Sequence, residues 1–130
     1  MADGSEAVLD ASAVIALLWE ESGSDAVEGL LGAAVVSAVN WSEVLQRYNA
    51  LGLDTAGRRD SVEALGISIE DFSGDDAETA ASMWASTRSA GLSLADRACL
   101  SLARRLGLPA HTADRAWETV DVGVEVVLIR

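Results

Sequence analysis

Residues 6–21 read EAVLDASAVIALLWEE, and this stretch decides the class of fold. Its first part, Glu6–Asp10, is a short apolar run that ends in an acid, a pattern typical of a buried strand. Its second part predicts a helix that carries Val14, Leu17 and Leu18 on one face. A strand that passes directly into a helix is the beginning of a crossover unit, so the stretch indicates an α/β protein.

The rest of the chain repeats this alternation of strands and helices. Further strands are predicted at residues 33–37, 67–72, 109–112 and 124–129, and further helices at residues 24–31, 39–52, 54–65, 75–90 and 92–107. Strands separated by helices favour a mainly parallel sheet that is covered on both faces. The chain contains no internal repeat, low-complexity segment or linker, so residues 1–130 are expected to form a single domain.

Composition narrows the class of protein. With one cysteine, Cys99, the chain forms no internal disulfide, which fits a reducing compartment. No apolar run approaches the roughly 20 residues that span a bilayer, and the acidic N-terminus is unlike a signal peptide. We therefore expect a cytoplasmic protein. A net charge of −12 argues against broad electrostatic binding to nucleic acid, but it does not exclude a nucleic-acid enzyme with a local basic patch or a bound metal ion.

Four acids fall where strands end or helices begin. Asp10 ends the first predicted strand, and Glu43 lies in the early turns of the helix that follows the second one. Asp96 opens the helix at residues 92–107, where it shares a face with apolar residues, and Asp114 follows the strand at residues 109–112. Ligands of parallel sheets bind outside the carboxyl ends of the strands. We therefore expect the four acids to project toward one edge of the sheet.

Each acid also has a structural explanation. Asn40 with Glu43, and Ser93 with Asp96, have the spacing of a capping box, and Asp114 could cap the short turn that follows it. Clustered carboxylates, however, repel one another and need a cation. An all-oxygen ligand set suits Mg²⁺ or Mn²⁺ rather than Zn²⁺. Such an ion beside a phosphate indicates hydrolysis of a phosphodiester or a phosphomonoester.

Four segments together resemble the PIN domain. They are LDASAVIALL (9–18), WSEVL (41–45), LSLADRACLSLARRLG (92–107) and HTADRAW (111–117). Their order and spacing are similar to those of the VapC toxins of bacterial type II toxin–antitoxin pairs. The resemblance implies a three-layer α/β/α sandwich with a parallel sheet of about five strands. It also implies endoribonuclease activity that depends on Mg²⁺ or Mn²⁺.

The resemblance assigns residues and partners as well. It implies that the metal-binding and catalytic acids are Asp10, Glu43, Asp96 and Asp114, and that the hydroxyls of Ser12 and Thr112 support them. The chain departs from the family at Ala95, where members often carry glycine. The implied partners are an RNA substrate, a cognate antitoxin and a second copy of the chain.

Other functions remain open at this point. Phosphoacid hydrolases usually carry an aspartate two residues after the first one, where this chain has Ser12. Both they and response-regulator receivers use a lysine, which this chain lacks. A PIN-like module that binds RNA or protein without cleaving it is the third alternative. Arg97 and Arg115 could meet RNA phosphates or pair with local groups, while His111 is expected to be a strand residue and Cys99 a buried thiol.

Overall fold

The computed structural model describes residues 4–130. Within this range five strands form one parallel sheet in the order β3-β2-β1-β4-β5. The strands are β1 (Ala7–Leu9), β2 (Ala34–Ser37), β3 (Ile67–Glu70), β4 (Ala110–Thr112) and β5 (Val126–Leu128). The helices are α1 (Ala11–Leu18), α2 (Ser24–Glu28), α3 (Ala38–Ala50), α4 (Arg58–Ala64), α5 (Gly74–Ser82), α6 (Trp84–Thr87) and α7 (Leu94–Leu106), with 3₁₀ helices η1 (Arg88–Ala90) and η2 (Arg115–Thr119). The predicted parallel sheet is confirmed.

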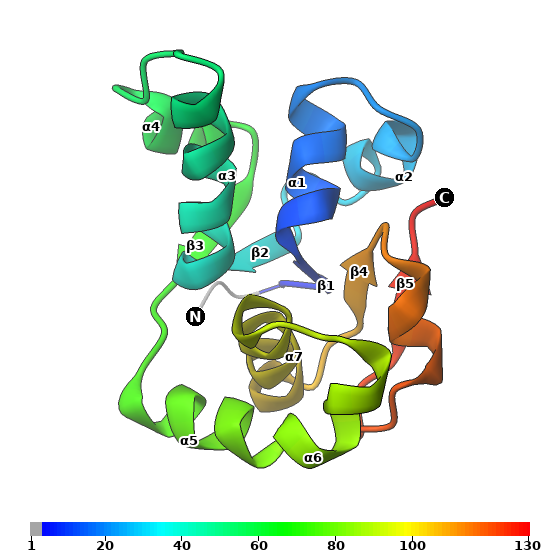
Figure 1. Cartoon of the computed structure of the whole chain (residues 1–130). Helices are drawn as coiled ribbons and strands as arrows, with labels where there is room; N and C mark the ends of the chain where they lie inside the picture. Colours follow the sequence, from blue (N-terminus) through cyan, green and yellow to red (C-terminus); the bar gives the residue numbers. More distant parts are fainter. Residues whose placement is uncertain (1–3) are drawn as a thin grey trace.

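Helices cover both faces of the sheet. In Figure 1, α1, α2, α3 and α4 lie above the strands, and α5, α6 and α7 lie below them. Alternate residues of the central strands supply two separate cores. Leu9 and Val36 face the first group of helices, and Val8 and Val35 face the second. All four side chains are fully buried, which explains why these strands are apolar without alternation. The predicted three-layer sandwich is confirmed.

The central strand, β1, sets the place of the site. Its neighbours are β2 on one side and β4 on the other, with Leu9 in register with both Val36 and His111. From β1 the chain moves outward through β2 to β3, and then crosses to β4 on the opposite side. This reversal makes the carboxyl end of β1 a topological switch point, where open α/β sheets bind their ligands. Asp10 directly follows this end.

The prediction of one helix at residues 75–90 is wrong. The chain bends near Met83 and forms three shorter helices, α5, α6 and η1. Hydroxyl groups at the bend compete for helix carbonyls: Ser82 Oγ donates to Thr79 O at 2.6 Å, and Thr87 Oγ1 donates to Met83 O at 2.8 Å. The bend buries Met83 and leaves Trp84 52% exposed.

The starts of α3, α4 and α7 also differ from those predicted, and α7 begins at Leu94 rather than at residue 92. α4 starts at Arg58 rather than at Asp54, because the Asp54 carboxylate accepts the N–H of Ala56 at 2.9 Å and forms a local turn. α3 starts at Ala38, where the Ser37 hydroxyl caps the first turn. Asn40 and Glu43 therefore lie inside α3, and their interpretation as a capping box is wrong.

Among residues 4–130, no helix combines the length and the apolar character needed to cross a membrane.

Candidate active site

Asp10 directly follows β1 and caps α1. Its Oδ1 accepts hydrogen bonds from the Ser12 hydroxyl at 2.7 Å and from the Ala13 N–H at 2.9 Å, and its Oδ2 accepts one from the Thr112 hydroxyl at 2.6 Å. These contacts confirm that Ser12 and Thr112 support Asp10. The side chain is only 4% exposed. Burial raises the pKa of Asp10 to about 6; the three hydrogen bonds oppose this shift, and the charge of Asp96 adds to it.

Asp96 lies in the first turn of α7 and is partly buried. Its Oδ2 accepts the N–H of Ser93 at 2.9 Å, while the Ser93 hydroxyl accepts the N–H of Asp96 at 3.1 Å. The predicted capping box is therefore confirmed at this helix. Capping and electrostatic coupling coexist here, because the charge of Asp96 also raises the pKa of Asp10 and of Glu43.

Glu43 projects from α3 toward the start of α7. Its Oε1 accepts a hydrogen bond from Asn40 Nδ2 at 3.0 Å, and the same nitrogen donates to the carbonyl of Ala95 at 3.0 Å. Burial raises the pKa of Glu43, the hydrogen bond from Asn40 lowers it, and the charge of Asp96 raises it. Glu43 therefore joins the same electrostatic cluster as Asp96.

Asp114 follows β4 and is exposed. Its Oδ1 accepts the N–H of Ala116 at 2.9 Å, so it caps η2 as one of the structural interpretations predicted. Its own N–H donates to Thr112 Oγ1 at 3.0 Å. Since Thr112 also donates to Asp10, one hydroxyl connects the backbone at Asp114 to the carboxylate of Asp10. The place of Asp114 among metal ligands stays a prediction.

Cys99 lies within electrostatic reach of three of the acids. This thiol on α7 is fully buried, as predicted, and its pKa is raised well above the usual value by burial and by the charges of Asp10, Asp96 and Glu43. The acids thus act on one point in the core. They come from the junction of β1 and α1, from α3 and from α7, which are far apart in sequence.

The donor chemistry of this cluster fits a magnesium-type ion. Within residues 4–130, no three side chains among His, Cys, Asp and Glu stand close enough to surround a metal on their own. Mg²⁺, however, is commonly held by one or two carboxylates together with waters and substrate phosphates. Asp10 and Asp96, which repel each other electrostatically, are two carboxylates with the oxygen donors that such an ion prefers.

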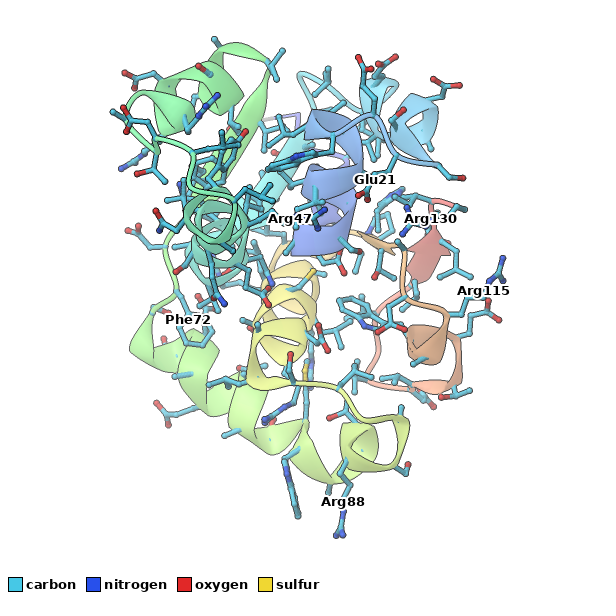
Figure 2. All side chains as sticks on the ribbon, turned by 45° about the horizontal axis from the view of Figure 1, so that its top comes forward. Glu21, Arg47, Phe72, Arg88, Arg115 and Arg130 are labelled. Carbon is cyan, nitrogen blue, oxygen red and sulfur yellow. The ribbon has the colours of Figure 1, made fainter. Side chains whose placement is uncertain are left out.

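A cavity of about 310 Å³ opens beside the cluster, between α1 and α3. Its lining residues are Ala11, Ile15, Glu43, Gln46, Arg47 and Ala50. Figure 2 shows Arg47 near Glu21 and Arg130, and Glu21 pairs with both arginines at 3.6 and 3.7 Å. Most of this cavity is apolar, with Glu43 and Arg47 providing opposite charges.

The other candidates have structural partners. Arg97 Nη1 donates to the carbonyl of Ala80 at 3.1 Å, which ties α7 to the last turn of α5. Arg115 contacts Glu118 at 3.4 Å and the carbonyl of Arg130 at 3.2 Å. His111 lies on β4, as predicted, and burial lowers its pKa although Glu125 opposes the shift. These contacts favour the structural interpretation of both arginines and of the histidine.

Sequence patterns did not single out Asn40 as part of the site. Its side chain is fully buried in the structure, between Glu43 and the start of α7. One signal was available, because Asn40 shares a helix face with Val44 and Tyr48 and is the polar member of that face. Its neighbour in space, Ala95, is 55 residues away along the chain, so the contact itself could not be inferred from spacing.

The family profile of the PIN domain matches residues 7–123 of this chain. The chain belongs to the PIN domain family. The resemblance stated from the four sequence segments is therefore confirmed, and no curated protein sequence matches this PIN domain.

Solved structures support the same fold. A chain from a toxin–antitoxin complex of Klebsiella pneumoniae is 20% identical with a TM-score of 0.71, and the alignment covers 96% of this PIN domain and 98% of that chain. VapC20 of Mycobacterium tuberculosis, described as a toxin that cleaves the sarcin–ricin loop, is 16% identical with a TM-score of 0.71. The alignment covers 92% of this PIN domain and 99% of VapC20. A DNA-bound VapBC chain from Salmonella typhimurium is 16% identical with a TM-score of 0.69, covering 97% and 99%.

Proposed function

We propose that this PIN domain is an endoribonuclease that depends on Mg²⁺ or Mn²⁺ and acts as the toxin of a type II toxin–antitoxin pair. The observation that carries the proposal is the buried carboxylate of Asp10 at the switch point of the sheet, coupled electrostatically to Asp96. The similarity to toxin chains in complexes from Klebsiella pneumoniae and Salmonella typhimurium supports the toxin role. Its partners would be RNA, an antitoxin and a second copy of the chain.

The residues that would hold the ion are Asp10, Glu43, Asp96 and Asp114. When bound, the ion supplies an activated water and stabilises charge on the leaving oxygen of the phosphodiester. Ser12 and Thr112 keep the Asp10 carboxylate in one orientation through hydrogen bonds of 2.7 and 2.6 Å. Because Asp10 is buried, an ion held by its carboxylate would compete with little water, which would strengthen the electrostatic attraction.

The cavity between α1 and α3 gives an RNA strand room beside Glu43. Its volume is at the lower limit of pockets that hold small ligands, so it suits a single nucleotide of the strand. Arg47 offers a cation for a phosphate on a chain that is otherwise strongly acidic.

The proposal is tested with Asp96→Asn. Asparagine keeps an acceptor oxygen for the N–H of Ser93 but removes one charge of the cluster, so the metal-free variant should be at least as stable as the parent. Cleavage of RNA should fall by at least about 100-fold. At a hundred times its dissociation constant, Mn²⁺ should stabilise the parent by about 2.7 kcal/mol, which raises its melting temperature by several degrees. The variant should lose most of this shift.

Asp60→Asn is the matched control, since Asp60 is an exposed acid in the first turn of α4. It should cleave RNA and respond to Mn²⁺ as the parent does. Activity that survives EDTA, or an equal Mn²⁺ shift in parent and Asp96→Asn, would contradict the metal site. Binding of RNA together with Mn²⁺, without cleavage, would favour the alternative of a non-cleaving PIN module.

A further inference from the structure

Asn40 is a fully buried polar side chain on α3, and both of its donor hydrogens are used. One goes to the Glu43 carboxylate on the next turn of the same helix, and the other goes to the backbone carbonyl of Ala95 on α7. Both distances are 3.0 Å. One amide group therefore connects a candidate acid to the helix turn that carries the next one, Asp96.

A buried asparagine at position 40 lowers the stability of the fold, which a residue with only a packing role would not do. Among the described residues, its Oδ1 is buried without a hydrogen-bond partner. A buried acceptor without a partner destabilises a fold, and an apolar residue of similar size would avoid that cost. Val44 and Tyr48, on the same face of α3, are buried without such an unpaired oxygen and pack in the core.

The chemistry of an amide suits this junction. Glu43 and Asp96 repel each other, so each needs restraint if the two are to stay near one ion. An arginine or lysine here would neutralise a carboxylate and compete with a metal ion. An asparagine donates hydrogen bonds without adding charge, so it restrains Glu43 and leaves its negative charge available.

We propose that Asn40, anchored to the carbonyl of Ala95 on α7, is a positioning residue that holds Glu43 in the arrangement that binds the metal ion. This inference rests on the proposed function, because it assumes that Glu43 contributes to the metal site. It makes Asn40 act through Glu43 rather than on the substrate. Its removal should therefore weaken metal binding in a manner that depends on the presence of Glu43.

A double-mutant cycle tests this dependence. Mn²⁺ affinity is measured by calorimetry for the parent, Asn40→Ala, Glu43→Ala and the double variant. Groups that orient metal ligands typically contribute about 10- to 100-fold to affinity, so Asn40→Ala should weaken Mn²⁺ binding by about 10-fold in the parent. In the Glu43→Ala background the same substitution should change the affinity by less than about 3-fold, because the group it positions is gone. Equal effects in both backgrounds would overturn the proposal.

Asn49→Ala is the matched control, since Asn49 is an exposed asparagine on the same helix. It should leave Mn²⁺ affinity unchanged. Melting curves without metal show whether Asn40→Ala is folded at the temperature of the titration. If it is not, Asn40→Ser, which keeps one hydroxyl donor, replaces it in the cycle, with the same expectation of a loss that requires Glu43.

Kinetics provide a second readout. If Asn40 positions a metal ligand, Asn40→Ala should lower kcat with little change in KM for RNA, and raising Mn²⁺ should restore part of the rate. A change confined to KM would overturn the positioning role. If the parent binds no Mn²⁺, the proposed function and this inference are overturned together. If the parent binds Mn²⁺ but Asn40→Ala has the same effect with and without Glu43, only the role of Asn40 is overturned.

Discussion

The carboxylate of Asp10 shows how a single residue can combine structural and chemical duties. It caps α1 through Ala13, connects β1 to β4 through Thr112, and remains 4% exposed. Three donors stabilise its charged form, yet burial still raises its pKa to about 6. Without a cation, the fold thus contains a carboxylate that favours its protonated form more than the unfolded chain does.

This shift predicts a dependence of stability on pH. The raised pKa corresponds to roughly 3 kcal/mol. Because the folded state binds the Asp10 proton more tightly, protonation stabilises the fold; this contribution is complete below the ordinary pKa of 3.8 and is lost as the pH rises through about 6. We therefore compare melting temperatures in EDTA. The melting temperature of Asp10→Asn minus that of the parent should be larger at pH 7.5 than at pH 4.5.

Melting curves at the two pH values measure this difference directly. Asp60→Asn makes the same change of charge at an exposed site and should follow the parent at both. If the difference in melting temperature between Asp10→Asn and the parent is the same at both pH values, burial does not raise the pKa of Asp10.

At the scale of elements, the starts of β2 and β3 depend on two glycines. Gly66 has a φ of +94°, and its carbonyl accepts the N–H of Gly32 at 3.0 Å. A Cβ at Gly66 would lie 2.4 Å from the Gly32 nitrogen and 2.7 Å from its Cα. The backbones that lead into these two strands therefore approach too closely for any side chain at this position.

We predict that Gly66→Ala lowers the free energy of unfolding by at least about 3 kcal/mol, because strain at positive φ adds to the clash with backbone atoms. Gly52→Ala is the control, since Gly52 also has a positive φ of +71° but has open space around its Cβ position. It should cost only about 1–2 kcal/mol. Urea unfolding of the three proteins measures both values, and an equal loss in the two variants would contradict the role of the close approach.

At the scale of the whole molecule, the charge of −12 favours association of the proposed toxin with a basic partner. An antitoxin segment rich in arginine would be attracted over a long range to this PIN domain, and an arginine could pair with the acid cluster in place of the ion. Salt screens such attraction, mostly through the association rate.

We therefore predict that the chain forms a stable complex with its cognate antitoxin and that this complex lacks nuclease activity. The association rate, measured by stopped flow, should fall by about 10-fold or more between 50 and 300 mM salt. A rate that is independent of salt would argue against electrostatic attraction. A complex that retains full nuclease activity would argue against inhibition through the acid cluster.

The sequence by itself determined the alternation of strands and helices and the placement of acids at their junctions. These features follow from local periodicity, and parallel topology brings all carboxyl ends to one edge. The sequence therefore predicted one region for all four acids, Asp10, Glu43, Asp96 and Asp114, before any contact was known. The family resemblance also followed from these segments. The bounds of α4 and the bend near Met83 could not be predicted, because single side chains that bond to nearby backbone decide them.

Only the tertiary structure decided which side chains meet. The bond from Thr112 to Asp10 spans 102 residues and that from Asn40 to Ala95 spans 55, so both depend on how β1 packs beside β4 and how α3 packs beside α7. The same packing excludes water from Asp10 and leaves Asp114 exposed, although the two acids look alike in the sequence. Burial and distance are properties of packing, and local periodicity carries no information about either.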